Sequence, residues 1–355
     1  MLRIFTSKWE KSIVSRFGQI LVLIVAVVVS SAVFAASPDN KLDLGGYTGM
    51  DAPHMYKQLP EPIVRKGYKF TVGFLQPWSG GKPLLLIEKE CEKKIKELGG
   101  KFISYDAVLD VQKQISQMNQ LISQKVDLII SYPVVEAGLT QSTKLATKAG
   151  IPVLQVNVPA KTTNPLDPNV IAMVGMSFDL YGYETVKWIS QKHPGAKVAF
   201  IGMALPTDNL PHIVGSAKHW AKELGLNVLG QVDAKTWNPA DGGVATQAIM
   251  GRWPDVEIIL TYNEYTALAA AAALRAAGKK GVLAGSMNGG DAAVIPALKD
   301  GTMLCQYLDP WAEVGEAAAI AAYRILTNQS LPAKRMLFKG QLVTKANVDS
   351  VQFVE

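Results

Sequence analysis

The sequence predicts an α/β fold of two similar lobes, each a doubly wound parallel sheet. Short, continuously apolar segments alternate with amphipathic segments of helical period over residues 70–156, and the alternation starts again at residue 179. Continuous apolar strands between amphipathic helices are typical of parallel sheets covered on both faces. The 320 residues that follow residue 35 also exceed what one hydrophobic core usually organises, which favours two lobes.

The first series opens with the apolar strand 70–75. The helix predicted at 84–98 carries Ile87, Cys91 and Ile95 on one face, and Gly99-Gly100 ends it. The same alternation predicts the remaining elements, which are strands at 102–105, 128–131 and 151–156 and helices at 111–124 and 136–149.

The second series repeats the pattern with a helix first. Amphipathic periodicity predicts the helix 209–224, which Gly225 closes, and the apolar run 198–202 before it predicts a strand. The other predicted elements are helices at 179–192, 240–250 and 264–277 and strands from 228, at 256–261, at 282–286 and from near Met303.

The N-terminal segment predicts export from the cytoplasm. A basic n-region comes first, with Arg3, Lys8, Lys11 and Arg16. An unbroken apolar run over 20–29 follows, and small or branched residues precede a cut after Ala35. A run of ten residues is too short to cross ~30 Å of hydrocarbon as a helix. We expect a signal peptide over 1–35, cleaved near Ala35, and an extension over 36–67; an uncleaved anchor is the alternative.

Composition excludes several classes of protein. After residue 35 the chain keeps 32 basic and 29 acidic residues, a net charge of +3, and no basic stripe, so no nucleic-acid partner is expected. Cys91 and Cys305 are 214 residues apart, which is not a disulfide framework. Cys91 shares an apolar helix face, so a buried thiol is expected there, with a disulfide to Cys305 as the alternative.

No signature of catalysis is found. The sequence contains no G-x-G-x-x-G or Walker phosphate loop after a strand and no G-x-S-x-G nucleophile elbow. His212 and His219 are two helical turns apart, with no carboxylate or thiol to complete a metal site. The sequence therefore predicts that the protein is not an enzyme and needs neither a cofactor nor a metal ion.

Polar amides and aromatic side chains follow the predicted strands. In chain order they are Gln76, Trp78, Ser79, Tyr132, Asn157, Trp237, Asn263, Asn288 and Gln306. Ligands of doubly wound sheets bind beyond the carboxyl ends of the strands. Amides both donate and accept hydrogen bonds, and indole faces stack on sugar or aromatic rings. Taken singly, each residue fits a turn or a helix cap; their recurrence at one topological position predicts a binding cleft.

Five segments, in order, resemble the type I periplasmic solute-binding proteins of ABC importers, in the ribose-binding-protein-like group. They are KFTVGFLQPW (69–78), AGIPVLQVN (149–157), TYNEYTALAAAAALRAAG (261–278), SMNGGDAAVIPALKDG (286–301) and LVTKANV (342–348). The resemblance covers about residues 68–350. Each segment alone is weakly specific, whereas the ordered set at family spacing is strongly so.

The resemblance implies ligand contacts at Gln76, Trp78, Ser79, Tyr132, Asn157, His212, Trp237, Asn263, Asn288 and Gln306. The chain departs from the family pattern at four positions. Asn157 and Asn288 stand where the family has Asp, and Val158 and His212 stand where it has Arg. Charged groups make the stronger hydrogen bonds to sugar hydroxyls. This set therefore favours a neutral ligand, flatter or bulkier than a pentose.

The resemblance also implies a hinge that the chain crosses three times, near Met176, near Tyr307 and at 331–334. Lobe 1 is then expected over 68–176 plus 307–331, and lobe 2 over 177–306 plus 332–355.

The function implied is that of a monomeric periplasmic receptor. It captures a small polar solute, sugar-like or a related neutral molecule, between the lobes and delivers it to the ABC transporter permease of the inner membrane. The alternative is a periplasmic sensor that presents its ligand to a membrane kinase or chemoreceptor.

Overall fold

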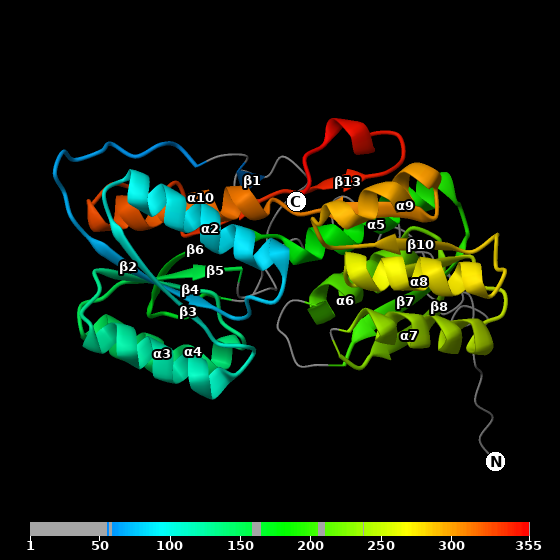
Figure 1. Cartoon of the computed structure of the whole chain (residues 1–355), viewed down its shortest axis with the longest axis horizontal. Helices are drawn as coiled ribbons and strands as arrows, with labels where there is room; N and C mark the ends of the chain where they lie inside the picture. The colour runs from blue at the N-terminus through cyan, green and yellow to red at the C-terminus, as the bar shows by residue number, and fades with distance from the viewer. Residues whose placement is uncertain (1–54, 57–58, 158–164, 205–209, 237, 355) are drawn as a thin grey trace, which may run out of the picture. The chain divides into compact units, whose positions relative to one another are not determined.

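The protein contains two α/β lobes, each built on one mainly parallel sheet (Figure 1). The computed structural model describes residues 55–56, 59–157, 165–204, 210–236 and 238–354, all within the unit Asp43–Glu355. The predicted signal peptide, its cleavage site at Ala35 and most of the extension 36–67 lie outside the described residues, and so does Trp237.

Over the described residues, the first sheet has seven parallel strands. Their spatial order is β1 (Met55–Tyr56), β12 (Arg335–Phe338), β6 (Val170–Met176), β5 (Val153–Val156), β4 (Leu128–Ser131), β2 (Thr71–Gln76) and β3 (Lys101–Asp106).

The second sheet has six strands in the part of the chain that the structure describes. Their order is β13 (Gln341–Val343), β11 (Met303–Leu308), β10 (Leu283–Ser286), β9 (Ile258–Thr261), β7 (Lys197–Met203) and β8 (Asn227–Ala234). All neighbours pair in parallel except β13, which runs antiparallel to β11 at the edge. The two parallel sheets confirm the predicted fold class.

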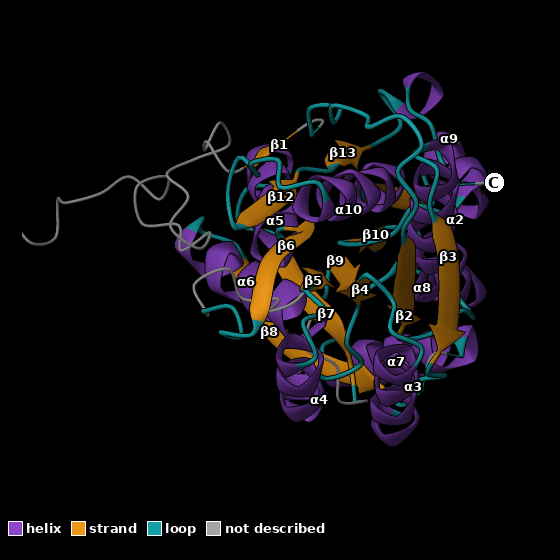
Figure 2. Ribbon diagram, turned by 90° about the vertical axis from the view of Figure 1, so that its left-hand side faces the viewer, coloured by secondary structure: helices purple, strands orange, loops and turns teal. Residues whose placement is uncertain are grey.

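Helices cover the sheets in pairs. In Figure 1 the pair α2 (Lys82–Glu97) and α10 (Trp311–Leu326) lies on one side of the first sheet, and the pair α3 (Val111–Ser123) and α4 (Glu136–Lys148) lies on the other. The pairs of the second sheet are α5 (Phe178–Lys192) with α6 (Leu210–Glu223) and α7 (Pro239–Arg252) with α8 (Glu264–Ala276). Two short helices, η2 (Ala292–Val294) and α9 (Ile295–Asp300), follow β10, and η3 (Val348–Ser350) follows β13. Figure 2 shows the strands enclosed by these helices.

Local chemistry accounts for the limits of these elements. Asp110 caps α3, because its side chain accepts hydrogen bonds from the N–H groups of Gln112 and Lys113. Gly99 follows α2 at φ +88, a conformation that side chains disfavour. The strands β4 and β5 are fully buried, as parallel strands covered on both faces should be.

Within the described residues the chain passes between the two sheets three times, and the third crossing lies elsewhere than predicted. It leaves the first sheet after Met176 and leaves the second after Leu308, at the end of β11. The third crossing, predicted at 331–334, lies instead at Lys339–Gly340, because β12 pairs with β6 in the first sheet. Lobe 2 therefore does not hold all of 332–355. A Cβ at Gly340 would lie 2.3 Å from the carbonyl oxygen of Leu308, so only glycine lets these two crossings run so close.

Among the elements that the sequence analysis did not predict are the strands β6 and β12, besides β1 and the helix α10. Residues 170–176 form a continuous apolar run that the strand criteria detect, so this strand was predictable. β12 has only four residues, and its assignment to the first sheet depends on a parallel pairing with residues more than 150 positions earlier.

Candidate functional site

The strands of each sheet end together at one edge. In the first sheet Ser131 lies beside both Leu75 and Gln155, so β2, β4 and β5 end in register. In the second sheet Ser286 lies beside Thr261 and Gln306. The residues just beyond these positions form the candidate site, because this edge is where doubly wound sheets bind ligands.

Two predicted amides of the first lobe are buried here, and only one polar atom of each side-chain amide is hydrogen-bonded within the protein. Gln76 donates through Nε2 to the carbonyl oxygen of Leu84 (2.9 Å) and to Glu88 Oε2 (3.2 Å). Asn157, at φ +61, accepts the N–H of Met176 at Oδ1 (3.1 Å). Gln76 Oε1 and Asn157 Nδ2 find no hydrogen-bond partner within the described residues. Each amide is thus held in place through one of its polar atoms, while its other polar atom remains available for a hydrogen bond to a ligand.

The predicted aromatic loop of the first lobe is folded onto itself. A Cβ at Gly80 would lie 2.1 Å from Cζ2 of Trp78, so the indole covers the glycine that follows it. Ser79 Oγ donates to Asp106 Oδ2, which ties this loop to the end of β3. Tyr132 is buried after β4, and its carbonyl oxygen accepts the Nε2 group of Gln114 (2.9 Å).

The structure brings two predicted amides of the second lobe together around Gly289. Gln306 donates through Nε2 to the carbonyl oxygen of Tyr307 (2.8 Å). Its Nε2 lies 2.6 Å from the place of a Cβ at Gly289, the residue after Asn288. Both amides are buried, and in the described chain neither Asn288 Oδ1 nor Gln306 Oε1 has a hydrogen-bond partner.

The other predicted residues of the second lobe are placed differently. Asn263 is the N-cap of α8, and its Oδ1 accepts the N–H of Thr266 (2.9 Å). Asn263 therefore has the helix-cap role that the sequence analysis gave as the alternative to ligand binding. His212 lies half-buried in the first turn of α6.

Three more buried polar groups lie at the same edge of the first sheet, and the sequence analysis missed them. Ser131 and Gln155 are strand residues and Ser177 follows β6; Ser131 Oγ, Gln155 Oε1 and Ser177 Oγ lack a partner among the residues that the structure describes. The sequence feature that could have identified them is a polar residue within or directly after an apolar strand. The prediction used only residues beyond the expected strands, and therefore passed over them.

The second lobe also buries carboxyl groups beside Gly289. Glu264 opens α8, and burial raises its pKa to about 7, partly offset by backbone hydrogen bonds. Asp309 follows β11, and burial, together with the charge of Glu264, holds its pKa well above the usual range. The pKa of Asp291 is lowered, although its burial acts in the opposite direction, because Tyr265, an N–H group and Lys82 favour the charged form. The sequence analysis named none of these three acids as residues of the site.

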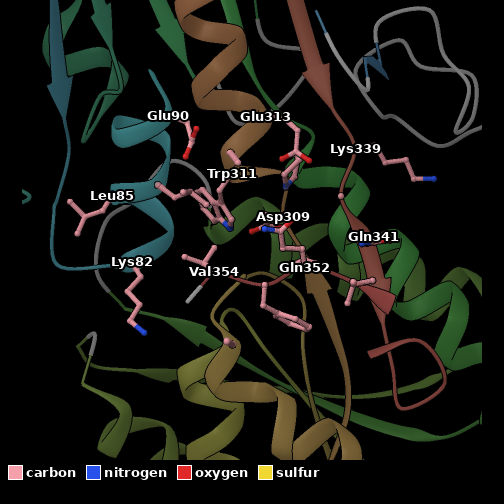
Figure 3. Close-up of a pocket in the computed structure, with 18 of the residues that line it drawn as sticks. Lys82, Leu85, Glu90, Asp309, Trp311, Glu313, Lys339, Gln341, Gln352 and Val354 are labelled. Carbon is pink, nitrogen blue, oxygen red and sulfur yellow. The ribbon is translucent and has the colours of Figure 1, made fainter. Parts of the chain in front are cut away.

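A large groove lies behind the same loop. It has a volume of about 2040 Å³ and is bordered by α2, the start of α10, β13 and residues 349–354 (Figure 3). Trp311 and Asp309 lie at its centre in Figure 3. None of the nine predicted ligand residues that the structure describes lines it. We therefore distinguish this groove from the candidate site, which has the buried amides.

The described residues contain neither a candidate metal site nor a candidate membrane-spanning helix. Across the described ranges, no group of three or more His, Cys, Asp or Glu side chains could hold a metal ion. Nor does any helix there have the length and apolar character needed to cross a bilayer.

Comparisons with known proteins agree with this arrangement. Residues 72–330 match the family described as the periplasmic binding protein domain. The ribose import binding protein RbsB of Bacillus subtilis is 25% identical over 259 residues, which cover 73% of this chain and 82% of that protein. The fructose import binding protein FruE of Bifidobacterium longum is 26% identical, over 66% of this chain and 73% of that one.

A solved structure has the same fold. The periplasmic component of the arabinose ABC transporter from Shewanella sp. ANA-3 superposes with a TM-score of 0.71 at 21% identity, covering 79% of this chain and 93% of that chain. The match of the family over most of the chain, together with the two sheets, their three connections and the polar strand ends, shows that the protein belongs to the periplasmic binding protein domain family.

Proposed function

We propose that this protein is the binding component of an ABC importer, and that it captures a neutral sugar or sugar-like polyol at the carboxyl ends of its two sheets. The proposal rests chiefly on the half-bonded, buried amides at these ends. Gln76 and Asn157 from the first lobe, and Asn288 and Gln306 from the second, each keep one polar atom there that has no partner among the described residues.

This pattern suits hydroxyl groups. A hydroxyl both donates and accepts a hydrogen bond, so it satisfies an amide oxygen such as Gln306 Oε1 and an amide nitrogen such as Asn157 Nδ2 equally well. A buried polar group without a partner is costly, which favours a ligand that completes it. The relatives named for ribose and fructose import support the class of solute.

The proposal includes transport rather than catalysis. Both relatives are named as import binding proteins, which supports delivery of the solute to a permease from outside the cytoplasm. A sugar incubated with the protein should be recovered chemically unchanged, and uptake by cells should require the permease that the protein serves.

A thermal-shift screen tests the ligand class. The protein exported to the periplasm of an expression host is heated with D-ribose, D-fructose, D-allose, myo-inositol or a nucleoside. A ligand at 100 times its Kd stabilises the folded state by about 2.7 kcal/mol, so the melting temperature should rise by several degrees. Stabilisation by nucleosides and by none of the sugars or polyols would contradict the proposal.

The variant Gln306→Leu tests the site. Loss of an amide that pairs with buried ligand hydroxyls should weaken binding by about 1–3 kcal/mol, roughly 5- to 150-fold in Kd, measured by calorimetry. The control is Gln352→Leu, which changes an exposed glutamine in the groove. If the control loses affinity and Gln306→Leu does not, the ligand occupies the groove instead.

A further inference from the structure

We propose that Glu264 and Asp309 are positioning residues of the ligand site: their carboxyl groups clamp the Gly289–Gly290 segment from two sides and thereby fix the amides of Asn288 and Gln306. This inference rests on the proposed function, since it assigns a role to two residues that the ligand need not touch.

Glu264 holds one side of the segment. Its side chain is almost fully buried, and Oε1 accepts the N–H groups of Gly290 (3.2 Å) and Asp291 (3.5 Å). The segment lies directly on the other oxygen, because a Cβ at Gly289 would be 2.2 Å from Oε2. Gly289 also has φ +148, so both its conformation and its contact exclude a side chain.

Asp309 holds the other side. Oδ2 accepts the N–H of Gly289 (3.1 Å), and the N–H of Asp309 donates to the carbonyl oxygen of Gly289 (2.9 Å). The indole Nε1 of Trp311 donates to the same oxygen (3.2 Å). Both polar groups of Gly289 are thus held by the connection between β11 and α10, where the chain leaves the second sheet.

The clamp acts on the amides because they adjoin it. Asn288 directly precedes Gly289, and Ser286 Oγ donates to its carbonyl oxygen (2.7 Å). Gln306 lies three residues before Asp309 on β11, with Nε2 close to Gly289. A shift of the Gly289–Gly290 segment would therefore move Asn288, and it would remove the contact between Gly289 and the side chain of Gln306.

The chemical cost of the clamp indicates that it has a role. Buried carboxyl groups are unfavourable, and the replacement of buried charged groups by apolar side chains often stabilises a protein. Here two carboxyl groups share one site, with Asp291 nearby. Asp291 pairs with Lys82 (3.5 Å) and accepts the hydroxyl of Tyr265 (2.6 Å), while Tyr181 faces Asp309. Perturbed acids of this kind gather at functional sites.

The test compares an acceptor-keeping variant with an acceptor-free one. Glu264→Gln retains a carbonyl oxygen for the N–H groups of Gly290 and Asp291, whereas Glu264→Leu fills a similar volume without an acceptor. Calorimetry with D-ribose and D-fructose measures affinity, and hydrogen exchange measures the protection of the amides at 289–291. The variants Asp309→Asn and Asp309→Leu form a second pair, in case Glu264→Leu does not fold.

We expect the Leu variants to raise Kd at least tenfold and to expose the 289–291 amides, and the Gln and Asn variants to stay within about fivefold of the native protein. Asp300→Ala is the matched control, because Asp300 also accepts a loop N–H in this lobe, that of Thr302 (2.8 Å), but is exposed. It should leave Kd unchanged.

Two results would overturn the clamp: faster exchange with unchanged affinity in the Leu variants, which means a purely structural role, or exchange that does not change. If the native protein binds neither sugar, the proposed function fails for these ligands, and the exchange data still decide whether the two carboxyl groups hold the loop.

Discussion

Cys91 and Cys305 are both buried and unbonded, in agreement with the expectation for Cys91 and against a disulfide. Burial raises the pKa of the Cys305 thiol to about 12 and also raises that of Cys91. Because the thiolate is the reactive species, neither residue should react with a thiol reagent in the native protein. A colorimetric titration should find no reactive thiol before unfolding and two after it. Loss of two hydrogens in the intact mass would instead indicate a disulfide.

Gly289 is the residue on which the second-lobe site depends most closely. We expect Gly289→Ala to lower both affinity and stability, because its Cβ would collide with Glu264 Oε2 in a backbone conformation that favours glycine. Gly301 is the control, since it also has positive φ (+80), but a Cβ there would have no neighbouring atom within 4 Å. Gly301→Ala should lower the melting temperature only slightly and leave the Kd for a bound sugar unchanged. Equal effects on Kd would contradict a role specific to Gly289.

Among the elements, the contact between α10 and α2 depends on close helix packing. A Cβ at Gly315 would lie 2.4 Å from the carbonyl oxygen of Ile87, so Gly315→Ala must push the two helices apart. We expect a loss of about 1–3 kcal/mol in the free energy of unfolding, measured by urea denaturation.

The matched control for this contact is Gly215, which lies exposed within α6 and has nothing within 4 Å of a Cβ. Gly215→Ala should stabilise the protein by about 0.4–1 kcal/mol, because alanine loses less backbone entropy in a helix. If both variants were stabilised, the two helices would have room to separate, and the tight contact would not contribute to stability.

For the whole molecule, the buried acids predict that stability falls as pH rises. Glu264 has a pKa of about 7 in the folded protein against 4.5 as its ordinary value, because burial disfavours its charged form. Between these values the folded state binds more protons than the unfolded state, so the free energy of unfolding decreases from about pH 4.5 to 7, by on the order of 3 kcal/mol. The raised pKa of Asp309 acts in the same direction.

The urea midpoint should therefore be lower at pH 8 than at pH 5.5, and Glu264→Gln should flatten this dependence. The lowered pKa of Asp291 acts in the opposite direction, but only below about pH 4. The same slope in the native protein and in Glu264→Gln would mean that Glu264 is not the group that titrates.

Ligand binding should also bring the two lobes together. Asn157 follows a strand of the first sheet and Asn288 follows a strand of the second, so one small molecule that contacts both favours the closed arrangement by its differential affinity. Solution scattering should give a smaller radius of gyration with saturating sugar, and the fluorescence of the six tryptophans that follow residue 35 should change. A tightly bound sugar that leaves the radius unchanged would favour a rigid receptor that binds on one lobe.

The sequence by itself determined the α/β class, the two parallel sheets and most element limits, because apolar runs, helical periodicity and terminal glycines such as Gly99 act over a few residues. It also predicted amides at the strand ends, since parallel strands bring their carboxyl ends to one edge. Only the tertiary structure decided that β12 returns to the first sheet and that Glu264 and Asp309 are buried beside Gly289. Strand partners and burial come from contacts between residues far apart in the chain, and no local pattern records them.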